Sequence, residues 1–531
     1  MAEHRAIALS DMPENEMVDV KVGGRDLVLV RRGNDVHALD GKCPHKGVPM
    51  SKGTIVGDQL VCGIHRAAFA LHTGELQAPP ACEALQRYDT RVDDGQVFVA
   101  VPGDGATDGH GQQPVWPVPQ MARRGDDPRH FIIVGAGAAG WRATETLRIE
   151  GFEGQITVVG DEHSGPYDRT DLSKAYLGAS DTPSVTPLRD MAVANEHGIE
   201  LRHGRAVSLD PGANELTVEA DGSQVVLVYD NLLLATGSAS RMLPLDGADK
   251  TGIHTLRTEV DAKCLREDLD DLLAANGKAK VVIIGAGFIG LEAAASLTKR
   301  DGVSVTIIAM EKLPMARLFG DAFGERLLAE HRDAGVTVLT EARTEAFIGA
   351  DRVQGVQLAG GQVVDADLVL VAVGAKPNTD WLPFETLRDG GIAAGQDLRV
   401  PGQDNIYVAG DIAQVPTPWG KTRIEHWRFA QETGELAARN MLGGTRGYES
   451  TPFFWTMQHI GGSYTLTGHN GSDDVAEGDV VPDDFAVRYV RNGEVTAVLA
   501  HGLDDHLTKL ERDMAGEGPL PGDVVNLGAL G

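Results

Sequence analysis

Cysteine, aromatic residues and positive charge are all scarce in this chain of 531 residues. Four cysteines are too few for a disulfide framework at this length, which excludes a disulfide-stapled secreted scaffold. Aromatic residues make up only 5% of the chain, whereas glycine is abundant at 65 residues. The 48 Lys and Arg are outnumbered by 77 Asp and Glu, which gives a net charge of −29. We therefore expect no nucleic-acid partner, and a positively charged patch on any protein partner.

Long apolar runs are also missing from the sequence. No stretch approaches membrane-spanning length, and residues 1–17 lack the charged-then-apolar pattern of a signal peptide. We therefore expect a cytoplasmic protein without membrane insertion. Apolar residues at 42% and charged residues at 24% are ordinary for globular protein and exclude wholesale disorder. The length suggests about three to four domains.

The chain changes pattern along its length. The first hundred residues contain short strands separated by turns, such as Asp26–Val30 and Gln96–Val101. Residues 103–128 are rich in Gly, Pro, Asp and Gln and predict a linker, which as a flexible coil would span roughly 25–30 Å. That reach allows the N-terminal domain either to swing or to stay docked. Strands then alternate with helix-like segments, and strands followed by a charged helix return after Thr451.

Two Cys–His pairs lie in the N-terminal region. Cys43 and His45 form the first, and Cys62 and His65 form the second, with sixteen residues between His45 and Cys62. Two thiolates and two imidazoles fit either tetrahedral zinc or a Rieske [2Fe–2S] cluster. Zinc fingers normally pair Cys with Cys and His with His, so the mixed pairs favour the cluster.

This pattern, C-x-H-x(16)-C-x-x-H, resembles that of Rieske ferredoxin domains at every ligand. The resemblance implies that each loop gives its Cys to one iron and its His to the other. In respiratory Rieske proteins, Ser and Tyr donors after the second loop raise the potential. Residues 66–69 here are Arg, Ala, Ala and Phe, and neither loop holds an additional Cys for a disulfide. The sequence therefore predicts a low-potential, ferredoxin-like cluster.

Two copies of G-x-G-x-x-G each follow an apolar strand and open a helix-like segment. In that context the glycines let backbone N–H groups approach a pyrophosphate at a helix N-terminus. The second copy begins 150 residues after the first, so the chain holds two separate nucleotide-binding folds. Asp161 follows the second strand of the first fold and is placed to bind a ribose, with Glu162 as the alternative. The six glycines are Gly135, Gly137, Gly140, Gly285, Gly287 and Gly290.

Further segments tell the two copies apart. Residues 166–174 are similar to the P-Y-x-R-x-x-L-S-K stretch of FAD-dependent ferredoxin reductases and apoptosis-inducing factors. Residues 234–237 resemble their A-T-G turn, residues 405–411 their second FAD fingerprint, and residues 425–427 the helix start that faces the flavin. The resemblance implies that the first copy binds FAD. Beside its three glycines, the implied FAD-binding residues are Asp161, Arg169, Lys174, Ala235, Thr236, Gly237, Asp411, Glu425, His426 and Trp427.

The second copy then takes the pyridine nucleotide. An acidic residue normally ends the second strand of an NAD site, but Ala309 stands there. Glu311 is the nearest acid that could reach the ribose, while Lys312 or Arg317 could meet a 2′-phosphate. We expect NAD(P)H as the reductant, with NADH favoured.

Three residues are predicted to act at the flavin. Lys174 and Glu292 occupy positions that pair beside flavin N5 in such reductases, although Glu292 could instead be a solvated helix residue. Trp455 lies in a P-x-F-W segment that faces the flavin in the same family, or packs between domains. No Cys lies between Cys82 and Cys264, which excludes the redox-active Cys pair of disulfide reductases.

The whole arrangement resembles the Rieske-fused proteins similar to apoptosis-inducing factors. It implies an all-β Rieske domain at 1–102, a linker at 103–128, a Rossmann-like FAD domain at 129–250 and 375–450, a Rossmann-like NAD(P) domain at 251–374, and a small α+β domain at 451–531. The implied function is NAD(P)H-dependent flavin reduction, with electrons passing one at a time to the cluster and on to an external acceptor, such as an oxygenase or other metalloenzyme. An NADH-responsive redox sensor, or a quinone or oxygen reductase with an ancillary cluster, is the alternative. A homodimer is one option for assembly.

Overall fold

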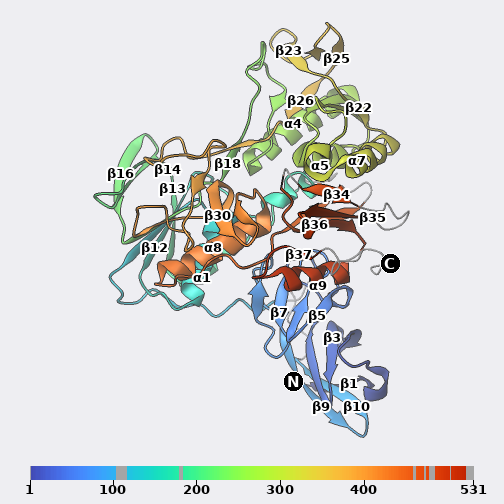
Figure 1. Ribbon diagram of the computed structural model, residues 1–531, viewed down its shortest axis with the longest axis vertical. Coiled ribbons are helices and arrows are strands. Elements are labelled where there is room, and N and C mark those ends of the chain that lie inside the picture. Colours follow the sequence, from blue (N-terminus) through green and yellow to red (C-terminus); the bar gives the residue numbers. More distant parts are fainter. Residues whose placement is uncertain are drawn as a thin grey trace.

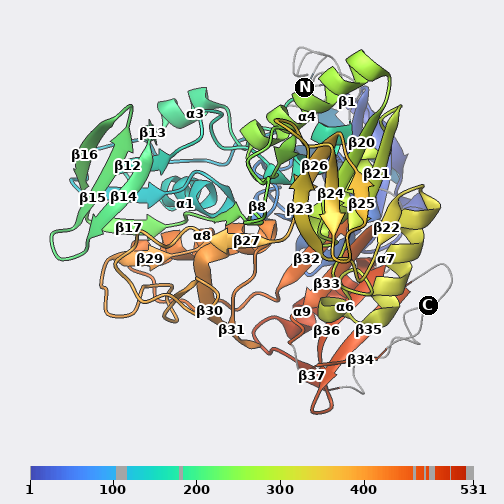
Figure 2. The same cartoon turned by 90° about the horizontal axis from the view of Figure 1, so that it is seen from above.

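The computed structural model describes residues 2–102, 116–178, 183–457, 462–471, 474–477, 485–502 and 504–521. Half of the predicted linker, residues 103–115, therefore lies outside the described residues, and residues 116–128 contain neither helix nor strand. In Figure 1 the N-terminal β domain lies at the bottom, below helix α9 (Asp504–Met514). The two α/β units lie above it, and Figure 2 shows them side by side from above.

The N-terminal region contains two antiparallel sheets. The larger has the order β1-β10-β9-β4-β3-β2, and the smaller has the order β5-β6-β7-β8. The loop after β4 carries the first Cys–His pair, and the loop between β6 and β7 carries the second. The strands are β1 (Ala2–Ala8), β2 (Met17–Val22), β3 (Arg25–Arg32), β4 (Asp35–Asp40), β5 (Thr54–Val56), β6 (Gln59–Val61), β7 (Ala68–Ala70), β8 (Leu76–Ala78), β9 (Arg87–Asp93) and β10 (Gln96–Val101).

The first α/β unit is a parallel sheet with the order β13-β12-β11-β17-β29. Its central strand is buried along nearly its whole length, as expected for a sheet covered on both faces. A small antiparallel sheet, β14-β15-β16, is inserted between β13 and β17. The elements are β11 (His130–Val134), α1 (Ala138–Ile149), β12 (Gln155–Gly160), α2 (Ala175–Gly178), α3 (Met191–Glu196), β13 (Ile199–His203), β14 (Arg205–Asp210), β15 (Glu215–Ala220), β16 (Ser223–Val228), β17 (Asn231–Leu234), β29 (Ile406–Val408) and α8 (Trp427–Met441).

The second α/β unit repeats this plan with the parallel order β19-β26-β20-β21-β22. A capping box at Thr258 and Asp261 starts α4, and Gly277 ends it in the left-handed conformation. The elements are β19 (Ile253–His254), α4 (Glu259–Asn276), β20 (Ala279–Ile284), α5 (Phe288–Leu297), β21 (Val303–Ile308), α6 (Ala316–Phe319), α7 (Asp321–Asp333), β22 (Thr337–Leu339), β23 (Thr344–Ile348), β24 (Gly355–Leu358), β25 (Val363–Asp365) and β26 (Leu368–Val371).

The C-terminal unit is an antiparallel sheet, β32-β33-β36-β35-β34, with β37 added to β36 and α9 alongside. The strands are β32 (Phe453–Met457), β33 (Ser463–Gly468), β34 (Val475–Glu477), β35 (Phe485–Arg491), β36 (Glu494–His501) and β37 (Leu520–Pro521). This α+β unit, the two Rossmann-like sheets and the N-terminal β region confirm the fold class expected from the sequence. Every helix in the described part of the chain is too short or too polar to cross a lipid bilayer.

Candidate functional site

The two Cys–His loops of the N-terminal domain lie tip to tip. Both Cys43 and Cys62 are buried. Nδ1 of His45 is 3.0 Å from Nδ1 of His65. Each loop is held by its own backbone, since Cys43 N–H donates to Val48 and Cys62 N–H donates to Ala67. The two imidazoles therefore face each other, one from each loop.

This two-and-two arrangement fits a Rieske cluster. Hydrogen bonding between the thiols of Cys43 and Cys62, followed by burial, raises the pKa of Cys43, so the two sulfur atoms are neighbours. Among the described residues, no three His, Cys, Asp or Glu side chains surround one point that could hold a single metal ion. A tetrahedral zinc site needs four donors around one ion. A Rieske cluster instead puts Cys ligands on one iron and His ligands on the other.

His65 is held as a neutral imidazole. Burial, and then the neighbouring His45, lower the pKa of His65 well below its usual value. A neutral imidazole has the free lone pair that a metal ligand requires. Nε2 of His45 faces the other way, toward Asp168 of the first α/β unit, at 3.5 Å from its Oδ2.

A cavity of about 1100 Å³ lies between the two α/β units and the C-terminal unit. Most of the residues expected from the sequence line it. They are Gly135, Gly137, Asp161, Arg169, Lys174, Ala235, Thr236, Gly237, Gly287, Glu292, Asp411, Glu425, His426, Trp427 and Trp455. Four others, Gly140, Gly285, Gly290 and Glu311, are not among its lining residues.

The glycines of the two loops divide into two kinds. A Cβ at Gly140 would lie 1.8 Å from the carbonyl oxygen of Gly135, and one at Gly290 would lie 2.1 Å from that of Gly285. These glycines let the helix approach the strand. A Cβ at Gly137 would meet no atom within 4 Å, so the backbone there is open to a ligand. The open backbone at Gly137, at the start of α1, and a cavity of about 1100 Å³ beside it fit FAD on the first copy.

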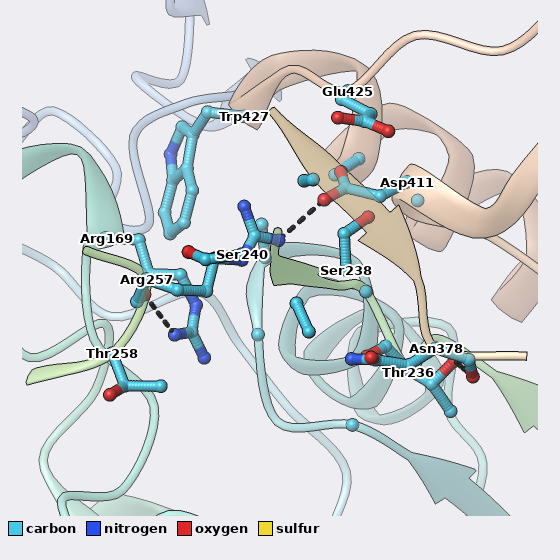
Figure 3. Close-up of a pocket in the computed structure, with 18 of the residues that line it drawn as sticks. Arg169, Thr236, Ser238, Ser240, Arg257, Thr258, Asn378, Asp411, Glu425 and Trp427 are labelled. Atoms are coloured by element: carbon cyan, nitrogen blue, oxygen red, sulfur yellow. Dashed lines mark hydrogen bonds and ion pairs between the residues drawn. The ribbon is translucent and has the colours of Figure 1, made fainter. Parts of the chain in front are cut away.

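Arg257 is a cavity residue that the sequence did not reveal. Its guanidinium is 2.6 Å from Asp411 Oδ2, and its carbonyl accepts a hydrogen bond from Arg169 at 2.9 Å (Figure 3). Glu162 is paired with Arg169 and Tyr167, which leaves Asp161 as the open acid at the ribose position. Arg257 lies just before α4, and no motif marks such a position. Only the folded chain brings it to the cavity.

Lys174 and Glu292 form an ion pair at the cavity wall, with 2.8 Å between Nζ and Oε2. Glu292 also accepts hydrogen bonds from Ser173 at 2.7 Å and from Thr456 at 3.0 Å. It is 5% exposed, so it is not a solvated helix residue. A buried carboxylate surrounded by these donors, with Met457 N–H as a fourth at 3.3 Å, is fixed in place.

Trp455 lies between the cavity and the Cys–His loops. Its ring centroid is 4.7 Å from that of His65 and 4.4 Å from that of His426. Trp455 and His426 both line the cavity, whereas His65 belongs to the N-terminal domain. One aromatic side chain therefore touches both the cavity and a predicted cluster ligand.

A buried charge network joins the N-terminal domain to the C-terminal unit. Arg66, 1% exposed, donates to Glu511 at 2.6 Å and to the Leu507 carbonyl at 2.8 Å, and its guanidinium lies 4.3 Å from the ring centroid of Phe453. Arg428 contacts the other oxygen of Glu511 at 2.6 Å. Burial would raise the pKa of Glu511, but Arg428 and Arg66 lower it below its usual value. We call Arg66, Glu511, Arg428 and Phe453 the docking latch.

Acid is expected to destabilise the unit that contains His426. Burial lowers the pKa of His426 from 6.5 to about 3, so between these values the unfolded chain binds a proton that the folded chain does not. The free energy of unfolding is unaffected by His426 above pH 6.5. It falls as the pH is lowered from 6.5 toward 3, by up to about 4–5 kcal/mol in total. A His426→Asn variant should lose less stability than the parent between pH 6.5 and pH 4. Denaturant titrations across that range give the slope of the free energy of unfolding against pH for each protein. Equal slopes in parent and variant would contradict the lowered pKa of His426.

Comparisons with known proteins agree with this geometry. The pyridine nucleotide-disulphide oxidoreductase model matches residues 129–434, and the Rieske [2Fe–2S] domain model matches residues 3–89. Human apoptosis-inducing factor 3 is 31% identical over 527 residues, which cover 96% of this chain and 83% of the relative. Rhodocoxin reductase of Rhodococcus erythropolis is 35% identical over 339 residues, covering 62% of this chain and 76% of the relative. The covalent putidaredoxin reductase–putidaredoxin complex is 26% identical, with a TM-score of 0.67, covering 75% of this chain and 96% of that one.

Fold and site together define an NAD(P)H-dependent flavoprotein reductase that carries a Rieske [2Fe–2S] domain. The chain belongs to the pyridine nucleotide-disulphide oxidoreductase family, and over most of its length it is similar to apoptosis-inducing factor 3 and to the ferredoxin reductases. The resemblance inferred from the motifs is confirmed. The roles of the individual residues stay predictions.

Proposed function

We propose that this protein passes electrons from NAD(P)H through FAD to its own Rieske cluster, one at a time, and on to an external acceptor such as an oxygenase or other metalloenzyme. The observation that carries the proposal is the contact of Trp455 with both the cavity and His65, at 4.7 Å between ring centroids. Electron transfer between two centres needs such a short, packed connection. The alternative role of Trp455, interdomain packing, is compatible with this one.

Each group of residues has a part in the reaction. When bound, FAD takes two electrons together from NAD(P)H and gives them singly to an iron–sulfur cluster. Gly137 and the N-terminus of α1 would hold the FAD pyrophosphate, and Asp411 its ribityl chain. Lys174, held in place by Glu292, would present its ammonium group at the flavin edge, where it favours the reduced, anionic ring. Cys43, Cys62, His45 and His65 would hold the cluster.

NADH is the coenzyme that the second nucleotide site favours. Ala309 at the end of β21 is buried and offers no acid. Glu311 and Glu341, at the ends of β21 and β22, are both exposed and joined by a backbone hydrogen bond of 3.2 Å. Two carboxylates at this edge repel a 2′-phosphate and oppose the attraction of Lys312 or Arg317.

The decisive experiment is an anaerobic titration of the purified protein with NADH and with NADPH, followed by optical and EPR spectra. We expect the flavin to bleach and a rhombic EPR signal to appear, with an average g below that of all-cysteine clusters, and NADH to act at the lower concentration. Flavin bleaching without that signal, in iron-replete protein, would contradict electron transfer from the flavin to the cluster of the same chain.

A redox-sensor function is the second candidate, and it has an observation of its own. His45 and His65 side chains are only 8% and 5% exposed, so the ligand edge of the cluster is covered in the docked arrangement. An external acceptor then has to wait for undocking. Very slow flavin reduction in stopped flow would favour the sensor, and fast reduction the reductase. The cytoplasmic location and the oligomeric state stay predictions.

A further inference from the structure

The contact between Asp168 and His45 crosses a domain boundary. Asp168 belongs to the predicted FAD-binding segment, two residues after Pro166, whereas His45 is a predicted cluster ligand of the N-terminal domain. Asp168 Oδ2 lies 3.5 Å from Nε2 of His45. Asp168 is 2% exposed, and Nε2 of His45 is buried and has no hydrogen-bond partner among the described residues. The acidic group beside the outer nitrogen of this ligand is therefore a buried carboxylate from another domain.

The carboxylate is held firmly in this position. Its Oδ1 accepts hydrogen bonds from Thr170 N–H at 2.9 Å and from the Thr170 hydroxyl at 2.6 Å, which makes Asp168 the N-cap of a short 3₁₀ turn. Its Oδ2 forms an ion pair with Nζ of Lys46 at 2.9 Å. These contacts hold the carboxylate between a backbone N–H, a hydroxyl and an ammonium group, a set of donors that suits a carboxylate.

We propose that Asp168 is a positioning residue for the Rieske cluster, whose carboxylate accepts a hydrogen bond from Nε2–H of His45 and lowers the reduction potential of the docked cluster. The physical reason is electrostatic. Reduction adds one negative charge to the cluster, and a fixed carboxylate beside a ligand opposes that charge in a buried, weakly screened site. The inference rests on the cluster of the proposed function, but not on electron transfer from the flavin.

Asp171 is a matched control for charge. It contacts Lys46 at 2.6 Å, on the same segment, but the His45 contact is made by Asp168. A neutral variant at Asp171 therefore removes one negative charge from beside Lys46 but keeps the proposed hydrogen bond between Asp168 and His45. If the potential responds only to net charge, the two positions should behave alike. If the hydrogen bond matters, Asp168 should have the larger effect.

The test is an EPR-monitored redox titration of the full-length protein with a chemical reductant and mediators. Asp168→Asn is expected to shift the equilibrium between oxidised and reduced cluster about tenfold toward the reduced form, which is 59 mV for a one-electron couple. Asp168→Glu should stay close to the parent, and Asp171→Asn should shift by well under half as much as Asp168→Asn. Asp168→Ser is a second neutral variant, and Asn and Ser are both good N-caps that preserve the turn.

Three outcomes would overturn the proposal. They are an unchanged potential in either neutral variant with its cluster intact, equal shifts at Asp168 and Asp171, and a potential that moves downward. Because the titration uses a chemical reductant, the cluster potential can be measured even if NADH does not reduce the cluster through the flavin. A protein that relays electrons but shows no Asp168 effect contradicts this inference alone. A protein without a Rieske signal under dithionite contradicts the cluster itself.

Discussion

Replacing Cys62 with serine is expected to abolish the Rieske EPR signal and one-electron output while NADH still bleaches the flavin completely. Cys62 lies in the N-terminal domain and is 2% exposed, whereas the cavity is lined entirely by residues after 133. A serine hydroxyl is a hard, weakly acidic ligand and does not replace a thiolate on iron. The measurement combines EPR of the dithionite-reduced protein with anaerobic stopped-flow absorbance of the flavin.

Cysteines outside the ligand set are controls for this variant. Cys264 is exposed on α4, and Cys264→Ser should keep both signals. Cys82 is buried and its thiol has a pKa raised by burial, so Cys82→Ser tests for a packing effect of the same substitution. A Cys62→Ser protein that retains the rhombic signal would contradict the role of Cys62 as a cluster ligand. One that loses flavin reduction by NADH would contradict the separation of the flavin site from the N-terminal domain.

Replacing Arg66 with methionine is expected to release the N-terminal domain from the docking latch. The variant leaves the Leu507 carbonyl and one oxygen of Glu511 without their buried donor, and breaking such a pair costs about 3 kcal/mol or more. That corresponds to about two powers of ten in the docking equilibrium. Stopped-flow measurement should show slower electron transfer from flavin to cluster, with unchanged flavin reduction by NADH. Small-angle scattering should show a larger radius of gyration.

Arg91 provides the matched control for Arg66. It is exposed on β9 of the same domain, where it forms ion pairs with Glu3 and Asp93 and lies over the ring of Phe98, all residues of that domain. Arg91→Met should change neither the transfer rate nor the scattering profile, because exposed pairs contribute little. Equal transfer rates in Arg66→Met and the parent would mean that other contacts, such as Lys46 with Asp171, hold the domain in place.

The sequence was sufficient for the features whose function requires adjacent residues. Gly137 and its neighbours follow a buried strand directly, and the Cys43 and His45 pair lies within one loop, so their spacing in sequence reflects their spacing in space. The family, the fold class and the four predicted cluster ligands could be inferred in this way. Lys174 and Glu292 needed a resemblance, because their pairing joins segments that are distant in the chain.

The remaining features depend on how the domains pack. Arg66 follows the second ligand loop and carries no motif, yet it ends fully buried against α9 at φ +59°. Asp168 lies inside a stretch predicted to bind FAD, and nothing in that stretch indicates a partner in the N-terminal domain. Such contacts arise between surfaces more than a hundred residues apart, where neither helical nor strand periodicity carries information. Residues of this kind are found only when the domains are seen together.

Docking of the N-terminal domain affects how well other proteins in solution can compete with it for electrons from the flavin. Two proteins that meet in solution exchange electrons at a rate set by their concentrations and by salt. A tethered and docked partner instead acts at a high effective concentration, about millimolar for a short linker. Electron transfer to the cluster should then be first order, insensitive to dilution and ionic strength. A free ferredoxin would have to displace the resident domain before it could receive an electron.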